Sequence, residues 1–235
     1  MSAAKVTRFF TPAVLAVGLL APPAAPVAHA QAKPQPRSTS TSARPSRSVS
    51  IGGYGTFGRV AFTAAESFDA ILGESTGNLF GGGMRVGLPW GGLFVDVGAW
   101  RFHAEGERAF VFNDEVVPLG IPVEVTVTPI EISGGWRFRF RRLSKFTAYA
   151  AGGFTAMKYQ ETSEFSTPAE DADETYSGYH LLGGAEYKIS RWLGVAGEAS
   201  WTTVPDAIGT AGVSQSFNET DLGGTTLRFK ITVGR

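Results

Sequence analysis

The sequence contains no cysteine, few histidines and methionines (three of each), and no excess of charge of either sign. Without cysteine, the chain can form neither disulfide bonds nor thiolate sites for catalysis or metal binding. Its 21 basic and 21 acidic residues balance, so composition offers no electrostatic reason to expect nucleic acid as a partner. Glycine and phenylalanine are abundant, with 30 and 17 residues. This composition favours a β-sheet protein over a helical one.

The first thirty residues have the features of an export signal. Lys5 and Arg8 precede a short apolar core over residues 9–21, and Ala28-His29-Ala30 supplies a small-x-small cleavage pattern. The apolar run is too short to span a bilayer, and prolines interrupt the residues after it. The expected organisation is a signal peptide over 1–30, a flexible Pro/Ser-rich leader over 31–49 and one β-barrel domain over 50–235.

From residue 50 onward the chain divides into eight segments that alternate as β-strands do, because successive side chains of a strand point to opposite faces of the sheet. Short turns and long polar loops alternate between the segments, a layout typical of outer-membrane barrels. The long loops are expected near 64–77, 104–122, 160–175 and 204–224. The strands are expected near 50–63, 78–88, 92–103, 123–140, 146–159, 176–189, 193–203 and 225–234.

The stretch GGWRFRFRR, residues 134–142, shows the alternation most strictly, with aromatic residues on one face and arginines on the other. Arginine facing lipid at mid-bilayer costs about 2–4 kcal/mol, so we place the arginines inside the barrel. The predicted lumen charge network, with a structural role, comprises Arg59, Arg85, Asp96, Glu131, Arg137, Arg139, Glu186, Glu198, Arg228 and Lys230. The predicted lipid-facing residues are Trp136, Phe138, Phe140, Leu181, Val195, Leu227, Phe229 and Ile231.

Two segments do not keep their alternation, and the faces of a third, 146–159, cannot be told apart. Valines stand at odd positions over 123–127, whereas Ile130 and the apolar residues after it are even. A β-bulge near Thr128-Pro129 would restore the phase, and a similar slip is predicted between Asp96 and Arg101. An aromatic girdle near the strand ends is predicted from Trp90, Trp192, Tyr54, Tyr149 and Tyr187.

The stretch GYHLLGGAEYKIS followed by RWLGVAGEASW, with inward Glu186 and Glu198, resembles the penultimate hairpin of the OmpA-transmembrane-domain and OmpX-like family. The resemblance covers residues 50–235 and implies an all-β, eight-stranded antiparallel up-and-down transmembrane barrel. It also implies a place in the outer membrane of a diderm bacterium, after export through the inner membrane. The implied partners are outer-membrane lipid, lipopolysaccharide and the barrel-insertion machinery; the chain would be a monomer that binds no nucleic acid.

No catalytic, cofactor-binding or metal-binding residue is predicted. Neither His103 nor His180 is followed two residues later by the serine of the lipid-A deacylases, and the carboxylates between 161 and 174 are interpreted as a solvated loop rather than a calcium site. The leading hypothesis is a non-enzymatic barrel with a side-chain-filled lumen, whose long loops serve envelope integrity or surface interaction. Two alternatives stay open: a soluble exported lipocalin-like barrel that binds an apolar ligand, and a lipid-A-modifying barrel enzyme that uses His103.

Overall fold

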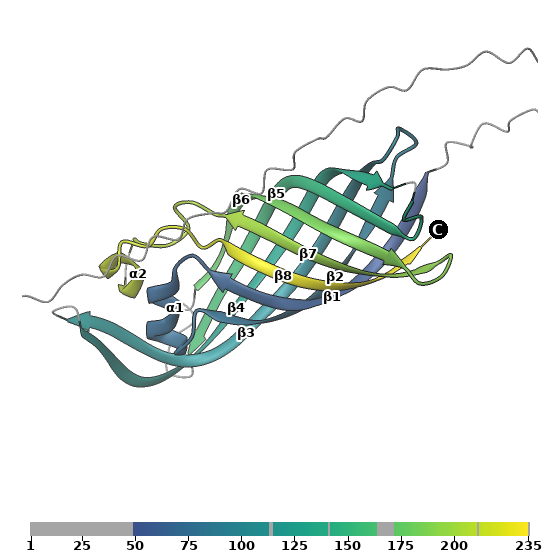
Figure 1. Cartoon of the computed structure of the whole chain (residues 1–235). Helices are drawn as coiled ribbons and strands as arrows, with labels where there is room; N and C mark the ends of the chain where they lie inside the picture. Colours follow the sequence, from purple (N-terminus) through teal and green to yellow (C-terminus); the bar gives the residue numbers. More distant parts are fainter. Residues whose placement is uncertain (1–48, 113–114, 141, 164–171, 211, 235) are drawn as a thin grey trace, which may run out of the picture. The chain divides into compact units, whose positions relative to one another are not determined.

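The computed structural model describes residues 49–112, 115–140, 142–163, 172–210 and 212–234. In this part of the chain, antiparallel strands pair in chain order, and pairing of the first with the last closes a barrel (Figure 1). The eight-stranded up-and-down barrel predicted from the sequence is confirmed, whereas the expected signal peptide and nearly all of the expected leader lie outside the described residues. The strands are β1 (Ser50–Phe62), β2 (Thr76–Gly87), β3 (Leu93–Phe112), β4 (Glu115–Arg139), β5 (Phe146–Ser163), β6 (Ala172–Lys188), β7 (Leu193–Thr203) and β8 (Gly224–Gly234).

Two hairpins are longer than the sequence predicts. The β3–β4 hairpin takes up most of the expected loop over 104–122, with one register shift between Glu107 and Ala109. The β5–β6 hairpin takes up both sides of the loop expected over 160–175, whose centre lies outside the described residues. Both extensions are at the same end of the barrel, opposite the short turns (Figure 1).

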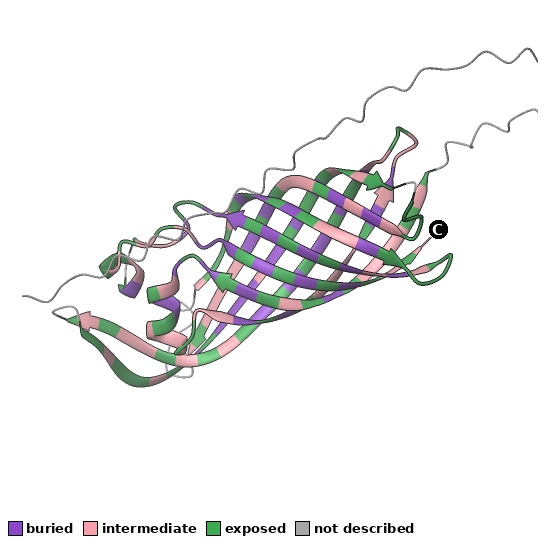
Figure 2. Ribbon diagram, viewed as in Figure 1, coloured by how far each residue is buried: buried purple, intermediate pink, exposed green. Residues whose placement is uncertain are grey.

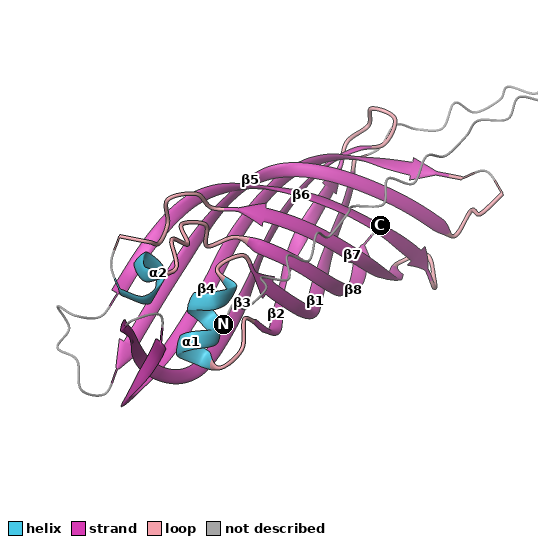
Figure 3. Cartoon of the chain, turned by 60° about the vertical axis from the view of Figure 1, so that its left-hand side comes forward, coloured by secondary structure: helices cyan, strands magenta, loops and turns pink. Residues whose placement is uncertain are grey.

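Two short helices lie at that same end, inside segments expected to be irregular loops (Figure 3). Helix α1 (Ala65–Leu72) ends at Gly73, which adopts a left-handed conformation with φ 74° and donates its N–H to the Asp69 carbonyl. Helix α2 (Gly212–Ser216) follows β7 and contacts both α1 and β3. Neither of these described helices has the length and apolar character needed to cross a bilayer.

The residues of each strand alternate between a buried and an exposed face, which Figure 2 shows as bands across the ribbon. The alternation also separates the faces of β5, which the sequence leaves unassigned. Thr147 and Tyr149 point into the barrel, whereas Phe154 is 77% exposed on the outside. Every strand therefore has one inner and one outer face, as a single-layer barrel requires.

The β-bulge predicted near Thr128-Pro129 is wrong, because β4 keeps a continuous register with β5 from Val123 to Arg139. The slip predicted between Asp96 and Arg101 is also wrong, since β2 and β3 pair without interruption from Leu79 to Gly87. Val123, Val125 and Val127 point inward and Ile130 and Ile132 point outward in one unbroken alternation. Both predictions assume a uniformly polar interior, but the interior is apolar at one end.

Candidate functional site

A network of charged side chains fills the half of the barrel interior nearest the short turns. Arg85 Nε donates to Asp96 Oδ2 at 2.8 Å, and its guanidinium lies 4.0 Å from carboxylates of β6 and β7. Arg137, on β4, forms the neighbouring ion pair with Glu186 at 3.3 Å. All but one of these groups are at least nine-tenths buried, and Arg137 is 12% exposed. The network begins at the turn end and continues deeper into the barrel.

Deeper in the barrel, two cations of β8 complete the network. Lys230 Nζ donates to Glu198 Oε2 at 2.7 Å, and Arg228 Nη1 donates to Glu131 Oε2 at 2.8 Å. Arg228 Nη2 also lies 3.1 Å from Glu198 Oε1, an ion pair without an aligned hydrogen bond, and donates to Ser200 Oγ at 3.1 Å. The network joins equal numbers of cations and carboxylates, namely Arg85, Arg137, Arg228 and Lys230 with Asp96, Glu131, Glu186 and Glu198. Its formal charge is therefore zero.

Two tyrosines extend the network and use the space left by inward glycines. Tyr54 donates to Asp96 at 2.6 Å, and its ring centroid lies 4.2 Å from Lys230 Nζ, a cation–π contact. A Cβ added to Gly83 or Gly98 would lie 2.5 Å from the Tyr54 hydroxyl. The glycines of the inner face therefore provide the space into which this ring fits.

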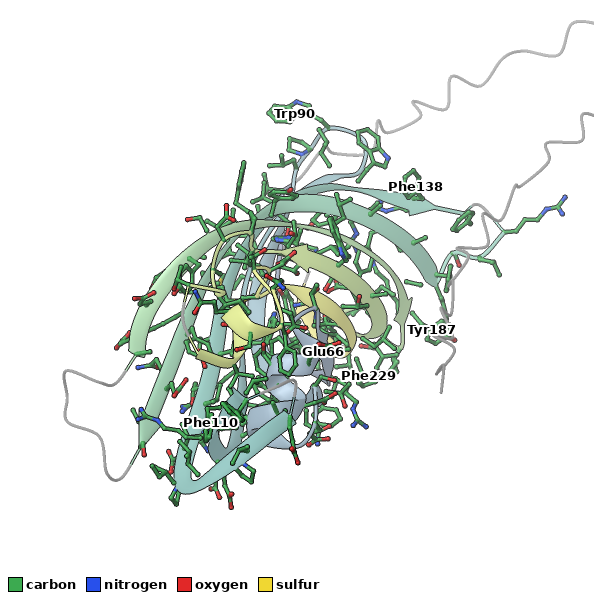
Figure 4. The ribbon with its side chains drawn as sticks, turned by 90° about the vertical axis from the view of Figure 1, so that its left-hand side faces the viewer. Glu66, Trp90, Phe110, Phe138, Tyr187 and Phe229 are labelled. Carbon is green, nitrogen blue, oxygen red and sulfur yellow. The ribbon has the colours of Figure 1, made fainter. Side chains whose placement is uncertain are left out.

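Tyr149 makes the corresponding contacts on the other side of the lumen. It donates to Glu198 at 3.0 Å, its ring lies 4.4 Å from the Arg85 guanidinium, and a Cβ on Gly184 would clash with it. The prediction that Tyr54 and Tyr149 belong to an aromatic girdle is therefore wrong. The other aromatic residues predicted there, Trp90, Trp192 and Tyr187, are exposed and lie in or next to the short turns. Figure 4 labels Trp90 and Tyr187.

Two residues predicted for the lumen network lie elsewhere. Arg59 is on the outer face, where its side chain is 63% exposed and lies 3.7 Å from Glu74, so its assignment to the lumen is wrong. It has the same parity as outward Phe57, whereas its neighbour Val60 points inward. Arg139 has the inward parity of Arg137 but is exposed, at the mouth of the lumen beyond the ion pairs. The remaining eight predicted residues form the network described above.

The half of the interior nearest the long loops is filled by a hydrophobic core. The rings of Phe62, from β1, and Phe68, from α1, are stacked with centroids 4.1 Å apart, and Phe102 packs edge-on against both. Trp100 joins the two halves, because its ring is in this core while its Nε1 donates to Glu131 at 3.0 Å. The core comprises Val60, Phe62, Ala64, Phe68, Leu79, Trp100, Phe102, Val125, Val127, Met157, Val204, Ala207 and Leu222. This core was not predicted from the sequence, although Val123, Val125 and Val127 of β4 indicate it.

Carboxylates of the last loop hold α1 and the chain around it over this core. Glu219 accepts hydrogen bonds from the backbone N–H groups of Glu66 and Ser67 at 3.0 and 2.8 Å, and from the Ser67 hydroxyl at 2.5 Å. These donors are at the N-terminus of α1, where the helix dipole favours an anion. Asp221 accepts from the backbone of Val204 and Gly223, each at 2.7 Å. The described residues of the first and last loops therefore form a cap held by hydrogen bonds, defined here as residues 64–75, 204–210 and 212–223.

Among the described residues, the side chains that hydrogen-bond to the two histidines of the barrel are hydroxyls. His103 is exposed on the outer face, and its Nδ1 lies 3.0 Å from Thr126 Oγ1. His180 is buried between the hydroxyls of Ser133 and Thr155, at 2.7 and 2.8 Å from its two ring nitrogens. Within the described residues, no three His, Asp or Glu side chains are arranged to hold a metal ion.

Every strand contributes apolar residues to one belt on the outer face, which in β3 and β4 covers the half nearest the short turns. Seven of the predicted lipid-facing residues are exposed there, and the eighth, Val195, is half-buried on the same face. Phe138, of β4, and Phe229, of β8, are both exposed on this face (Figure 4). Isolated apolar residues are common on protein surfaces, but an unbroken apolar belt is a surface for lipid or another protein.

No protein-family model and no curated protein matches the chain. Among solved structures, the barrel is similar to the Neisserial surface protein A, with 11% identity, a TM-score of 0.47, and coverage of 79% of this chain and 96% of the other. It is also similar to the outer membrane protein OprG of Pseudomonas aeruginosa (11% identity, TM-score 0.46, coverage 79% and 92%). A major outer membrane protein of Thermus thermophilus is similar at 9% identity, with a TM-score of 0.45 and coverage of 78% and 99%. The strand pairing and the exposed residues show that the chain forms a small eight-stranded β-barrel. Its outer face carries an apolar belt, and side chains fill most of its interior.

Proposed function

We propose that the chain is a non-enzymatic outer-membrane barrel whose lumen is filled by its own side chains and whose loop end acts at the cell surface. The observation that carries this proposal is the double filling of the interior, by a neutral charge network at one end and a capped hydrophobic core at the other. An eight-stranded barrel is just wide enough for its side chains to fill. Its role would be envelope integrity or surface contact rather than passage of solutes.

The proposed location in a membrane rests on the outer belt and on the closed sheet. A closed barrel leaves no strand edge unpaired, so the backbone can enter hydrocarbon without losing hydrogen bonds. In water, by contrast, exposure of Phe57, Phe154 and Phe229 and their apolar neighbours would be unfavourable. In outer-membrane barrels the short turns face the periplasm and the long loops face outward, so the cap and the extended hairpins would be extracellular.

The tip of the β3–β4 hairpin is the part of the loop end best suited to contact a partner. Phe110, Phe112, Val116 and Leu119 are exposed there, and the hairpin projects beyond the other strands of the barrel (Figure 1). Residues 115–122 of β4, which precede Val123, pair only with β3 among the described strands. A projecting apolar tip on an otherwise polar end is suited to contact another molecule at the cell exterior.

The soluble lipocalin-like alternative and the lipid-A-modifying alternative find less support. A lipocalin-like barrel needs an apolar cavity and a polar exterior, whereas here charged groups occupy the interior near the turns and aromatic residues cover the exterior. An enzyme using His103 would need a nucleophile and an acidic orienter beside it. Among the described residues, the side chain that hydrogen-bonds to His103 is Thr126, whose hydroxyl is not part of such a triad.

Fractionation and conductance test the proposal directly. The protein should stay in the membrane through a carbonate wash, migrate faster on gels before heating than after, and give no large steady conductance in a planar bilayer. Release by carbonate would contradict the membrane location. A steady channel would contradict the filled lumen, even if the location is right.

A matched pair of arginine substitutions tests which face meets lipid. Ile132→Arg places a cation in the middle of the outer belt and should lower the free energy of unfolding in lipid vesicles by about 2–4 kcal/mol. Gln160→Arg places the same side chain on the outer face near the loop end, opposite Asp173, and should cost less than about 1 kcal/mol. Equal effects of the two substitutions would contradict the proposed position of the membrane.

A further inference from the structure

We propose that the mouth of the lumen at the turn end is a binding site for a small phosphate-bearing anion. A cavity of about 320 Å³ opens there between β1, β2, β4, β6, β7 and β8. This volume is at the lower end of the range for small-molecule sites. The inference concerns the end opposite the cap and does not depend on what the loops contact.

The charges that line the cavity are strongly unbalanced. Its lining contains five cations, Arg85, Arg137, Arg139, Lys188 and Arg191, and one carboxylate, Glu186. Glu186 is already shared, since it lies 3.3 Å from Arg137 and 4.0 Å from Arg85. Arg139, Lys188 and Arg191 have no ion pair within the described residues. The neutral network thus ends in a mouth with three uncompensated cations.

Two guanidinium nitrogens of the arginines that line the cavity lack hydrogen-bond partners among the described residues. These are Arg137 Nε and Arg85 Nη2, and both atoms are buried. The whole Arg85 side chain is only 9% exposed. An unpaired buried donor is costly, and the cost is relieved by an acceptor that enters the site. Both arginines line the cavity, and Arg85 Nη2 itself lies 4.0 Å from Glu198 Oε2, within the network.

Guanidinium groups bind phosphate with paired, charge-assisted hydrogen bonds, and lysine adds a point charge. Three uncompensated cations fit an anion of more than one negative charge better than a single carboxylate. Ser190, Thr232 and Trp192 also line the mouth, where the two hydroxyls add polar groups. The class of ligand is therefore a phosphate group, either of a soluble periplasmic compound or of a lipid headgroup in the inner leaflet.

The test uses the folded barrel in neutral phosphatidylcholine vesicles, with inorganic pyrophosphate as the probe in a calorimetric titration. Wild-type protein should bind the probe, and the double variant Arg139→Gln with Lys188→Gln should bind it at least about tenfold more weakly. These two cations make no ion pair within the described chain, so folding should be unaffected, and heat-modifiable migration verifies this. The matched control is Arg59→Gln with Arg101→Gln, which removes two cations from the outer face and should leave affinity unchanged.

A fluorescence change localises the site. Pyrophosphate should alter tryptophan fluorescence, and the change should be lost in Trp192→Phe, at the mouth, but kept in Trp90→Phe, at another turn. No binding by the wild type at millimolar probe, or equal binding by the two double variants, overturns the proposal. These failures are distinct from failure of the proposed function, because they leave membrane retention and conductance untouched.

A second arm identifies the source of the phosphate. The same titration is repeated in vesicles that contain phosphatidylglycerol. If headgroups occupy the mouth, the apparent affinity for pyrophosphate falls in wild type, and this fall is absent in Arg139→Gln with Lys188→Gln. If the affinity is the same in both vesicles, the ligand is a soluble phosphate compound.

Discussion

Along β1 alone, the interior of the barrel changes from charged to aromatic. Tyr54, near the turn end, contacts Asp96 and Lys230, whereas Phe62, at the loop end, stacks on a helix of the cap. Side chains fill the narrow interior in both halves, but the interactions that stabilise the two halves differ. The polar half depends on matching every charge, and the apolar half depends on matching volume and on excluding water. This difference explains why the cap covers one end only: the hydrophobic core needs a lid, and the charged mouth does not.

Removal of a central carboxylate should have the largest effect. Glu198→Ala leaves Lys230 and Arg228 short of a partner, and breaking a buried ion pair from one side costs about 3–5 kcal/mol. Urea unfolding in lipid vesicles measures the loss. The paired variant Glu198→Met with Lys230→Met removes one charge of each sign and should recover most of the stability, since Arg228 keeps Glu131. If the paired variant is as unstable as Glu198→Ala, charge balance is not what maintains the polar half.

Truncation in the apolar half should cost somewhat less. Leu79 is fully buried in the core under the cap, and Leu79→Ala should lower stability by about 3 kcal/mol through lost burial and the cavity left behind. The same unfolding assay applies. Because the loss is one of volume, Leu79→Met should cost less than about 1.5 kcal/mol. A large penalty for the methionine variant would indicate that shape, rather than volume, controls this half.

A hydrogen bond from an uncharged donor to the network should matter less than its ion pairs. Tyr54→Phe deletes the donor to Asp96 and keeps the ring over Lys230, so we expect a loss of about 1.5 kcal/mol. Asp96 retains Arg85 as its partner. A loss of stability as large as that of Glu198→Ala would show that the tyrosines, and not the ion pairs, are the main source of stability in the polar half.

The smallest effect is expected at the fastening of the cap. Glu219→Gln removes the anion at the N-terminus of α1, and we expect a loss of about 1 kcal/mol, because the site is partly open to solvent. Hydrogen exchange of the α1 amides should accelerate while exchange in the strands stays unchanged. Faster exchange throughout the barrel would mean that the cap and the barrel unfold as one unit.

The fold could be predicted from the sequence because alternation in a barrel is local. Arg228 and Lys230 alternate with Leu227, Phe229 and Ile231, and one energetic argument about arginine in lipid decides which set is inside. The pairing of particular charges could not be predicted, since it depends on the stagger between strands that are distant in sequence. The two-residue period nevertheless places eight of the ten predicted network residues on the correct face and in the network.

The errors have a common physical cause, the assumption that the whole interior is polar. Keeping Val125 and Val127 out of a polar lumen requires them to face outward, and this in turn requires a bulge that does not exist. The same assumption turns Arg59 inward, although Val60 and Phe62 have the opposite parity. Tyr54 and Tyr149 were assigned to the aromatic girdle because the sequence does not show which glycines lie opposite them. In the barrel, these glycines leave the space that the two rings occupy.

The position of the two β8 cations along the chain has a consequence for assembly. Strands β2 to β7 supply all four carboxylates of the network but only two arginines, so a sheet that lacks β8 carries a net charge of minus two in its interior. Arg228 and Lys230 neutralise this charge only when β8 docks between β7 and β1. Strand β8 thus supplies the charges that neutralise the network at the closing pair of strands. A barrel that is not closed would contain carboxylates without a cationic partner. Closure is therefore expected to be all-or-none.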